Sequence, residues 1–197
     1  MEQFQQTIAK IDAINAEDPH IEIINGQEIP KELLYSQRMS TMLNDFEPDA
    51  SEYLRLAARA QHIKRWSVPR DSFPMDRKGY LLWRTQLKKF HGQLAGSIMR
   101  DSSYAEEEVK KVEDLLNKRN LKSDPDAQTL EDVACLVFLK YYFEDFIKQH
   151  EEDKVISIVQ KTWRKMSKRG QDAALALPMP REARGIIQQA LTSNKIE

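Results

Sequence analysis

The chain lacks most of the features that mark sheet-rich, secreted and membrane-spanning proteins. Its one cysteine, Cys135, excludes an internal disulfide and fits a reducing compartment. Six glycines and few β-branched runs leave little material for a sheet with tight hairpins. No apolar run approaches the ~20 residues that span a bilayer, and the first residues hold no apolar stretch typical of a secretory signal. We therefore predict a cytoplasmic protein without a membrane partner.

The overall charge is close to neutral, with 30 Lys and Arg against 31 Asp and Glu and a formal net charge of −1. This balance excludes a general attraction to nucleic acid or membranes, so any attraction must come from local patches. Charged residues make up 31% and apolar residues 41%, which is typical of a globular protein. A length of 197 residues predicts one domain, covering residues 1–197.

Apolar residues recur at intervals of three and four along most of the chain, which is the helical period. We therefore predict an all-α fold, a single-domain irregular bundle of about eight helices. The one extended piece expected is HIEIINGQEIP, with Asn25-Gly26 as its turn. The predicted helices include a helix over residues 50–66 capped by Asp49 or Ser51, a long helix over 76–101, and a helix beginning near Pro125 and running to about 149.

Cations are concentrated in one stretch, between Arg59 and His91, which holds nine Lys or Arg and two acids. Arginine clusters bind phosphate and carboxylate through paired hydrogen bonds. Arg65, Arg70 and Arg84 are the predicted ligand-binding residues, because tryptophans or prolines adjoin each of them. The alternative is a solvated face whose charges pair with acids such as those at 106–108.

Two histidines flank this basic stretch. His62 is predicted to share a helix face with Ala58 and Arg65, and His91 shares one with Arg84 and Leu87. Around both histidines, apolar residues recur at the intervals of a buried helix face, which predicts that both side chains point inward. They are either satisfied core residues or ligands of a bound group.

The segment QTLEDVACLVFL places Glu131 and Asp132 at the edge of an apolar helix stripe. A carboxylate buried there needs a partner, because an unpaired buried charge is very costly. The partner is either an arginine, Arg65 or Arg84, or a metal or proton-transfer site.

The string KMSKR at 165–169 resembles the ATP-binding loop of class I aminoacyl-tRNA synthetases. No nucleotide-binding signature or parallel-sheet pattern accompanies it. We interpret it as the basic C-terminal end of a helix that Gly170 stops.

The strings PKELLYSQRMS, PDASEYLRLAARAQHIKRW, RWSVPRDSFPMDRKGYLLWR and QTLEDVACLVFLKYYFEDF resemble a microbial family described as a domain of unknown function. Some of its members are labelled glutamyl-tRNA synthetase. The resemblance covers nearly the whole chain and implies no particular activity.

A remoter likeness is to the HD superfamily of helical metal-dependent phosphohydrolases. His62 is similar to its first histidine, and Asp132 is similar in setting to its late aspartate, although no His-Asp pair stands between them. The resemblance implies an HD-like core in which His62, His91 and Asp132 hold Mn, Fe, Co or Zn, with Glu131 as the catalytic base or as a residue that supports the metal ligands. A helical core that has lost the metal and kept the anion pocket fits the same residues equally well.

Three functions are compatible with these patterns. The first is a metal-dependent phosphohydrolase acting on a phosphate ester or nucleotide. The second is a non-catalytic binding protein for a phosphorylated or carboxylated small ligand, with RNA less favoured because no aromatic sheet platform is evident. The third is a basic interface for an acidic partner or for a second copy in a homo-oligomer.

Overall fold

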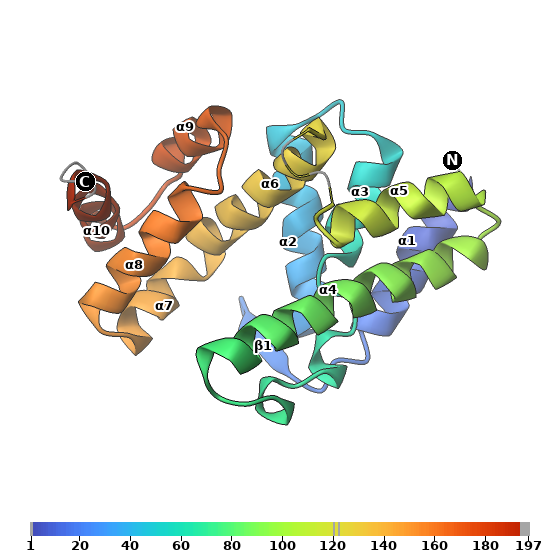
Figure 1. Ribbon diagram of the computed structural model, residues 1–197, viewed down its shortest axis with the longest axis horizontal. Coiled ribbons are helices and arrows are strands. Elements are labelled where there is room, and N and C mark those ends of the chain that lie inside the picture. The colour runs from blue at the N-terminus through green and yellow to red at the C-terminus, as the bar shows by residue number, and fades with distance from the viewer. Residues whose placement is uncertain (1, 120, 122, 194–197) are drawn as a thin grey trace. The chain divides into compact units, whose positions relative to one another are not determined.

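The computed structural model describes residues 2–119, 121 and 123–193, and these are built mainly from helices (Figure 1). The described residues form ten α-helices, two short 3₁₀ helices and one two-stranded hairpin. The predicted all-α fold is confirmed, with more helices than the eight or so expected.

The chain divides into two compact units, residues 1–130 and 131–197. The single domain predicted over residues 1–197 stays a prediction. The first unit contains α1 (Glu2–Asn15), β1 (Ile21–Ile24), β2 (Gln27–Pro30), α2 (Lys31–Phe46), α3 (Glu52–Ala60), the 3₁₀ helices η1 (Arg65–Ser67) and η2 (Arg70–Ser72), α4 (Arg77–Arg100), α5 (Glu106–Leu116) and the start of α6 (Pro125–Tyr141). The second contains the rest of α6, then α7 (Phe143–Gln149), α8 (Glu152–Trp163), α9 (Lys168–Ala176) and α10 (Arg181–Thr192).

The hairpin lies where the sequence predicts it. Strands β1 and β2 pair antiparallel, with Ile21 opposite Pro30. Asn25 and Gly26 have φ values of 52° and 79°, the left-handed conformation that a tight hairpin turn requires and that Asn-Gly supplies. Pro30 then ends the strand, and α2 begins at Lys31.

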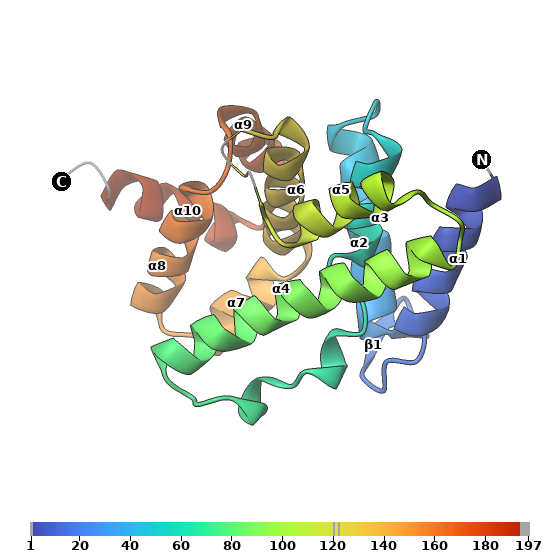
Figure 2. The same ribbon diagram turned by 45° about the vertical axis from the view of Figure 1, so that its right-hand side comes forward.

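In the first unit, α4 packs antiparallel against α5, and α3 packs against both α2 and α5 (Figures 1 and 2). Leu54, Ile63, Val109 and Val112 are fully buried there. Helix α3 shows why: in EYLRLAARA the apolar side chains gather on one face, and Ser51 caps its first turn by accepting a hydrogen bond from the amide of Leu54.

The predicted helix over 50–66 was too long. Helix α3 ends at Ala60, and Lys64 adopts a left-handed φ of 52° before η1 begins at Arg65. The amide of Lys64 donates to Oδ1 of Asn15 at 3.0 Å, so α1 holds this turn. His62 therefore lies in a turn and does not share a helix face with Arg65 as predicted.

Two further boundaries differ from the sequence predictions. The apolar helix that begins at Pro125 breaks at Tyr142, whose φ and ψ of −126° and −14° separate α6 from α7. The string KMSKR does not end a helix: its Ser167 caps the start of α9, accepting from the amide of Gly170, which lies inside that helix.

The second unit has a core of its own. Helix α8 packs against α10, and α7 contacts both of them. Phe143, Val155 and Val159 are at most 1% exposed. Along the described parts of the chain, no helix combines the length and apolar character needed to cross a membrane.

Candidate functional site

The carboxylate beside His62 comes from Glu32, at the start of α2. Glu32 is 7% exposed. Its amide donates to Oδ2 of Asp18 at 3.0 Å, and the other oxygen of Asp18 accepts from the amide and ring of His20. Asp18 is itself buried, so the loop after α1 fixes where α2 begins and where Glu32 stands.

His62 lies between Glu32 and an arginine. Its Nδ1 is 3.5 Å from Oε2 of Glu32, and its Nε2 is 2.9 Å from Nη1 of Arg65. An arginine can only donate, so Nε2 must accept and the ring carries its proton on Nδ1, facing Glu32. Tyr35 stacks on the other side of the ring, with centroids 4.0 Å apart. His62 is thus held as a neutral imidazole of defined tautomer.

The electrostatics of this group are unusual. Burial raises the pKa of Glu32 to about 7, with a smaller raising effect from Asp18, while Arg65 opposes the shift. Burial also holds the pKa of His62 well below its usual range, and nearby cations lower it further; they are Arg65, Lys118, Lys31 and Arg84. His62 therefore lies in a region of positive electrostatic potential.

His91, on α4, is the second histidine of the cluster. Its ring centroid is 5.9 Å from that of His62, and the residue is 4% exposed. Burial lowers its pKa, and a hydrogen bond with the backbone of Gln61 acts in the opposite direction. Its Nε2 is buried and has no hydrogen-bond partner among the residues that the structure describes. The two predicted histidines are thus neighbours, as expected for one site.

The three predicted arginines also meet, on two aromatic rings of α4. The guanidinium carbon of Arg65 lies 4.9 Å from the ring centroid of Trp83. Arg70 lies 5.9 Å from the Trp83 ring and 6.0 Å from that of Tyr80, and Arg84 lies 5.8 Å from Tyr80. We call Arg65, Arg70, Arg84, Tyr80 and Trp83 the arginine ladder.

Hydrogen bonds fix the loop that carries part of this ladder. Arg70 donates to the carbonyl oxygens of Phe73, Pro74 and Asp76, at 3.0, 2.7 and 3.3 Å. Nε1 of Trp83 donates to the carbonyl of Val68 at 2.8 Å. Arg70 therefore organises the loop, and Arg65 and Arg84 are the ladder members with more donors to offer a ligand.

The three arginines of the ladder are held in place by aromatic rings and not by any carboxylate that the structure describes. Among the described residues, no acidic side chain pairs with any of the three ladder arginines. Elsewhere arginines do have such partners: Arg59 contacts Asp12, and Arg100 contacts Glu106 and Glu113. Because an aromatic face attracts a cation through its quadrupole and carries no net charge, the ladder keeps its full positive charge.

Glu131 and Asp132 belong to the second unit and have partners there. Asp132 is 2% exposed and accepts hydrogen bonds from the amide and hydroxyl of Ser167. Glu131 is 6% exposed, with Nζ of Lys165 at 3.9 Å from its Oε1. The catalytic role predicted for Glu131 stays a prediction.

A metal needs a group of ligands, and the described residues contain no group of three His, Cys, Asp or Glu that could hold one. The predicted set of His62, His91 and Asp132 is divided between the two units. The described residues therefore do not fit a metal centre.

Sequence reasoning missed Glu32, Tyr35 and Tyr80. Glu32 looks like an ordinary acid in the first turn of a helix, where negative charge is common. Its pairing with His62 depends on how α2 packs against the turn after α3. The residues near Glu32 in the sequence do not predict that contact.

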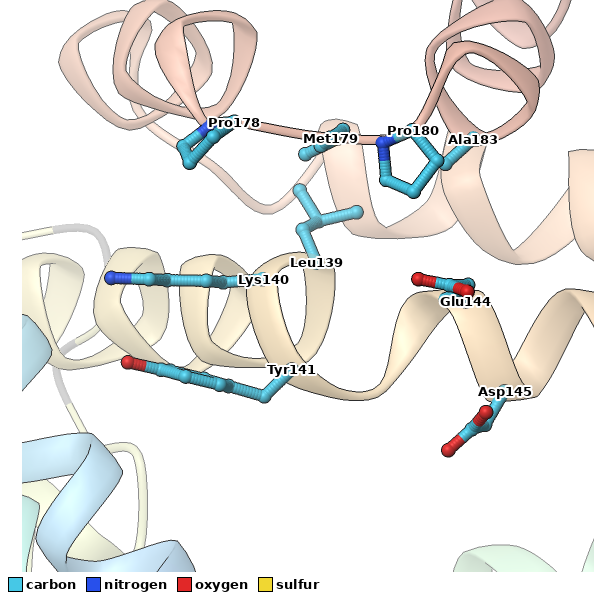
Figure 3. A pocket seen from close by; sticks show the side chains of 9 residues that line it. All are labelled: Leu139, Lys140, Tyr141, Glu144, Asp145, Pro178, Met179, Pro180 and Ala183. Carbon is cyan, nitrogen blue, oxygen red and sulfur yellow. The ribbon is translucent and has the colours of Figure 1, made fainter. Parts of the chain in front are cut away.

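The second unit has a groove of about 160 Å³ where α6 meets α7 and the α9–α10 connection passes over it (Figure 3). Leu139, Met179 and Pro180 form its apolar part, and Glu144 lies at its side. The side chains of Lys140 and Tyr141 run parallel, with the ammonium 5.2 Å from the Tyr141 ring centroid. Glu144 and Asp145 both contact Lys148, so this groove offers less unpaired charge than the ladder.

Comparison with known proteins gives a family. Residues 5–187 match the family described as Domain of unknown function (DUF4202). No curated protein matches the chain, and no solved structure matches it either. The resemblance to a family of unknown function is confirmed, and the likeness to the HD superfamily stays a prediction.

Proposed function

The chain belongs to this family of unknown function, and we propose that it binds a small phosphorylated or carboxylated ligand on the arginine ladder. One observation carries the proposal: Arg65 and Arg84 are held by aromatic rings and have no acidic partner among the described residues. A permanent cation in a half-buried setting attracts an anion more strongly than one in open water, since the local dielectric is lower.

Preorganisation supports the same conclusion. Arginine binds phosphate or carboxylate best through two parallel N–H groups. Stacking on Trp83 and the bond to His62 fix the guanidinium of Arg65 while using one of its five donors. A ligand would therefore meet an ordered fork and cause little loss of side-chain entropy on binding.

The surroundings of the ladder add to its field. Lys31, Lys118 and Arg84 all act on His62 in the same direction as Arg65. The one nearby carboxylate, Glu32, has a pKa raised to about 7 and is partly neutral at physiological pH. The net potential at His62 therefore favours a bound anion.

Binding is tested by thermal shift and calorimetry with inorganic phosphate, a phosphate monoester and its uncharged alcohol. We expect saturable stabilisation by the anions alone. Removing one charge-assisted pair by Arg65→Gln or Arg84→Gln should weaken binding by about 10-fold or more. Arg77→Gln, an exposed arginine outside the ladder, is the matched control. Equal affinity in R65Q, R84Q and R77Q would exclude the ladder as the site.

RNA is an alternative ligand that the same arginines could bind through its phosphates. An RNA complex should lose affinity steeply as salt rises, because phosphate contacts release counterions. A small-anion site should show saturation by one class of compound and a weaker salt dependence.

Hydrolysis of a phosphate ester is a second candidate, favoured by the contact between Glu32 and His62. A carboxylate at Nδ1 of a neutral histidine is the arrangement by which histidine acts as a general base. In this site the role requires that a substrate draws Arg65 away from Nε2, the nitrogen that would take the proton. The test is release of phosphate from a phosphate monoester by the wild type and by His62→Ala. Elemental analysis of protein purified without chelator, for Mn, Fe, Co and Zn, tests the metal that the HD likeness implies.

A further inference from the structure

Large apolar side chains are exposed at the beginning of α4. Met75 is 76% exposed, Tyr80 43%, Leu81 54% and Leu82 52%. We call Met75, Leu81 and Leu82 the apolar tip. In both ribbon views the first half of α4 extends beyond the other helices of its unit (Figures 1 and 2). The apolar tip is therefore at an edge of the unit.

Cations flank the apolar tip on the same helix. Arg77, Lys78 and Lys89 are exposed, and within the described part of the chain no acid pairs with them. The nearest acid in sequence, Asp76, uses its side chain to cap α4 by accepting from the amide of Gly79 at 2.7 Å. Lys78 and Lys89 are eleven residues apart, a spacing of about three turns, so they lie on one face of the helix.

Leu82 lies on that same face. It follows Lys78 by four residues and precedes Lys89 by seven, and both intervals return to the same side of an α-helix. Leu81 is adjacent to it. Along the first four turns, the exposed side of α4 therefore carries leucines with a long basic side chain on either side. Helices that lie on membrane surfaces have this composition.

We propose that the apolar tip and its flanking cations dock on the surface of an anionic lipid bilayer. The lipid phosphates and carboxylates complement Arg77, Lys78 and Lys89, and the leucines and Met75 leave water for the acyl boundary. Long basic side chains can reach the headgroups while their stems stay beside apolar atoms. Docking of this kind uses exposed apolar and basic side chains at the membrane surface. It does not require a helix that crosses the bilayer.

Other polyanions fit this surface less well. Nucleic acid would satisfy the cations but leave two leucines and a methionine in water, because it binds exposed side chains through phosphates and through stacking on aromatic rings. A rigid protein partner would need an apolar patch opposite the leucines and acidic groups placed opposite the flanking cations. A fluid bilayer adapts to the shape that the tip presents.

The test is co-sedimentation of the full chain with vesicles of phosphatidylcholine alone and of phosphatidylcholine with about one third phosphatidylserine. We expect binding to the anionic vesicles only, with a partition coefficient that falls as salt rises. Inorganic phosphate tests the ladder separately, because Leu81 and Leu82 take no part in it. Loss of vesicle binding with retained phosphate binding, or the reverse, distinguishes the two proposals.

Matched variants locate the surface. The double variant Leu81→Glu with Leu82→Glu should abolish vesicle binding, whereas Leu175→Glu should not, since Leu175 is a comparably exposed leucine (51%) in the second unit. Arg77→Gln with Lys78→Gln should lower the partition coefficient about 25-fold, at roughly fivefold for each charge. Lys154→Gln with Lys161→Gln, two exposed lysines of α8, is the charge control.

Circular dichroism melting of each variant confirms that it is folded. Equal binding of L81E/L82E and wild type would overturn the proposal. So would absence of binding to the anionic vesicles, and so would binding to single-stranded RNA without binding to vesicles.

Discussion

Single residues show two ways in which this chain buries a carboxylate. Asp132 is surrounded by donors from Ser167, an amide and a hydroxyl. Among the described residues, the carboxylate of Glu32 has no hydrogen-bond donor closer than the Nδ1 of His62, at 3.5 Å, and burial raises its pKa to about 7. A buried carboxylate without strong donors binds a proton more tightly than it would in water, so Glu32 is a place where the protein gives up stability.

Glu32→Gln tests this loss. Since the folded pKa is raised above the unfolded value, the stabilising effect of the protonated group is complete below about pH 4.5 and is lost as pH rises through about 7. We expect E32Q to gain about 2–3 kcal/mol in unfolding free energy relative to wild type between pH 4.5 and pH 8. Urea unfolding at both pH values measures the difference. Glu28→Gln, at an exposed position in β2, should show no such change, and a pH-independent difference for E32Q would contradict the burial argument.

Gly170 is a position where the surrounding side chains require glycine. A Cβ there would lie 2.6 Å from Cγ and Oδ1 of Asp132. We expect Gly170→Ala to cost about 1–3 kcal/mol through displacement of that carboxylate. Gly185→Ala is the control, because nothing lies within 4 Å of its Cβ position in α10, and alanine should there gain up to about 1 kcal/mol. Thermal or urea unfolding gives both values, and equal effects would refute the steric explanation.

Among the elements, the loop from η1 to α4 and the first turn of α4 act as one piece. Gly79 lets the chain pass closely, because a Cβ there would overlap the carbonyl oxygen of Pro74. That carbonyl accepts a hydrogen bond from Arg70. The geometry of the ladder thus depends on Gly79, which is not itself one of the ladder residues.

Gly79→Ala should therefore displace the loop and weaken anion binding, although it substitutes no residue of the ladder. We expect a loss of about 1–3 kcal/mol in stability and a severalfold weaker affinity for phosphate. Gln86→Ala, at an exposed position farther along α4, should change neither. Unchanged phosphate binding in G79A would show that the loop does not set the ladder.

The elements themselves were largely predictable from sequence. Apolar spacing located α2, α4 and α5, and Asn25-Gly26 located the hairpin turn, because these depend on local preferences. The end of α3 was not predictable, since the bond from Lys64 to Asn15 that holds the turn joins segments 49 residues apart. The role of Ser167 was missed because a basic stretch near a glycine also fits the end of a helix.

At the scale of the whole molecule, the site residues also show that contacts between distant segments cannot be predicted from local sequence. The concentration of Arg and His between residues 59 and 91 is visible in the sequence, and the structure brings His62 beside His91 and Arg65, Arg70 and Arg84 onto two shared rings. The sequence could not show that Glu32 supplies the nearby carboxylate, since that depends on the packing of α2. Nor could it show that Glu131 and Asp132 have partners within residues 131–197.

The sequence predicts that residues 1–197 fold as one domain, and calorimetry can test this. If residues 1–197 form one cooperative domain, calorimetry should show a single transition in which the calorimetric and van't Hoff enthalpies agree. Two transitions, or a calorimetric enthalpy well above the van't Hoff value, would mean that units 1–130 and 131–197 unfold separately. Repeating the scan with phosphate would show which transition the ligand moves.

The position of Trp83 gives the ladder an intrinsic optical signal. Its indole lies beneath the guanidinium of Arg65 and donates its Nε1 hydrogen to the carbonyl of Val68. An anion that arrives at Arg65 changes the electric field across the indole, and the wavelength and intensity of tryptophan emission respond to that field. The chain has two other tryptophans, Trp66 and Trp163. With both replaced by phenylalanine, the remaining fluorescence would follow occupancy of the ladder without any added label.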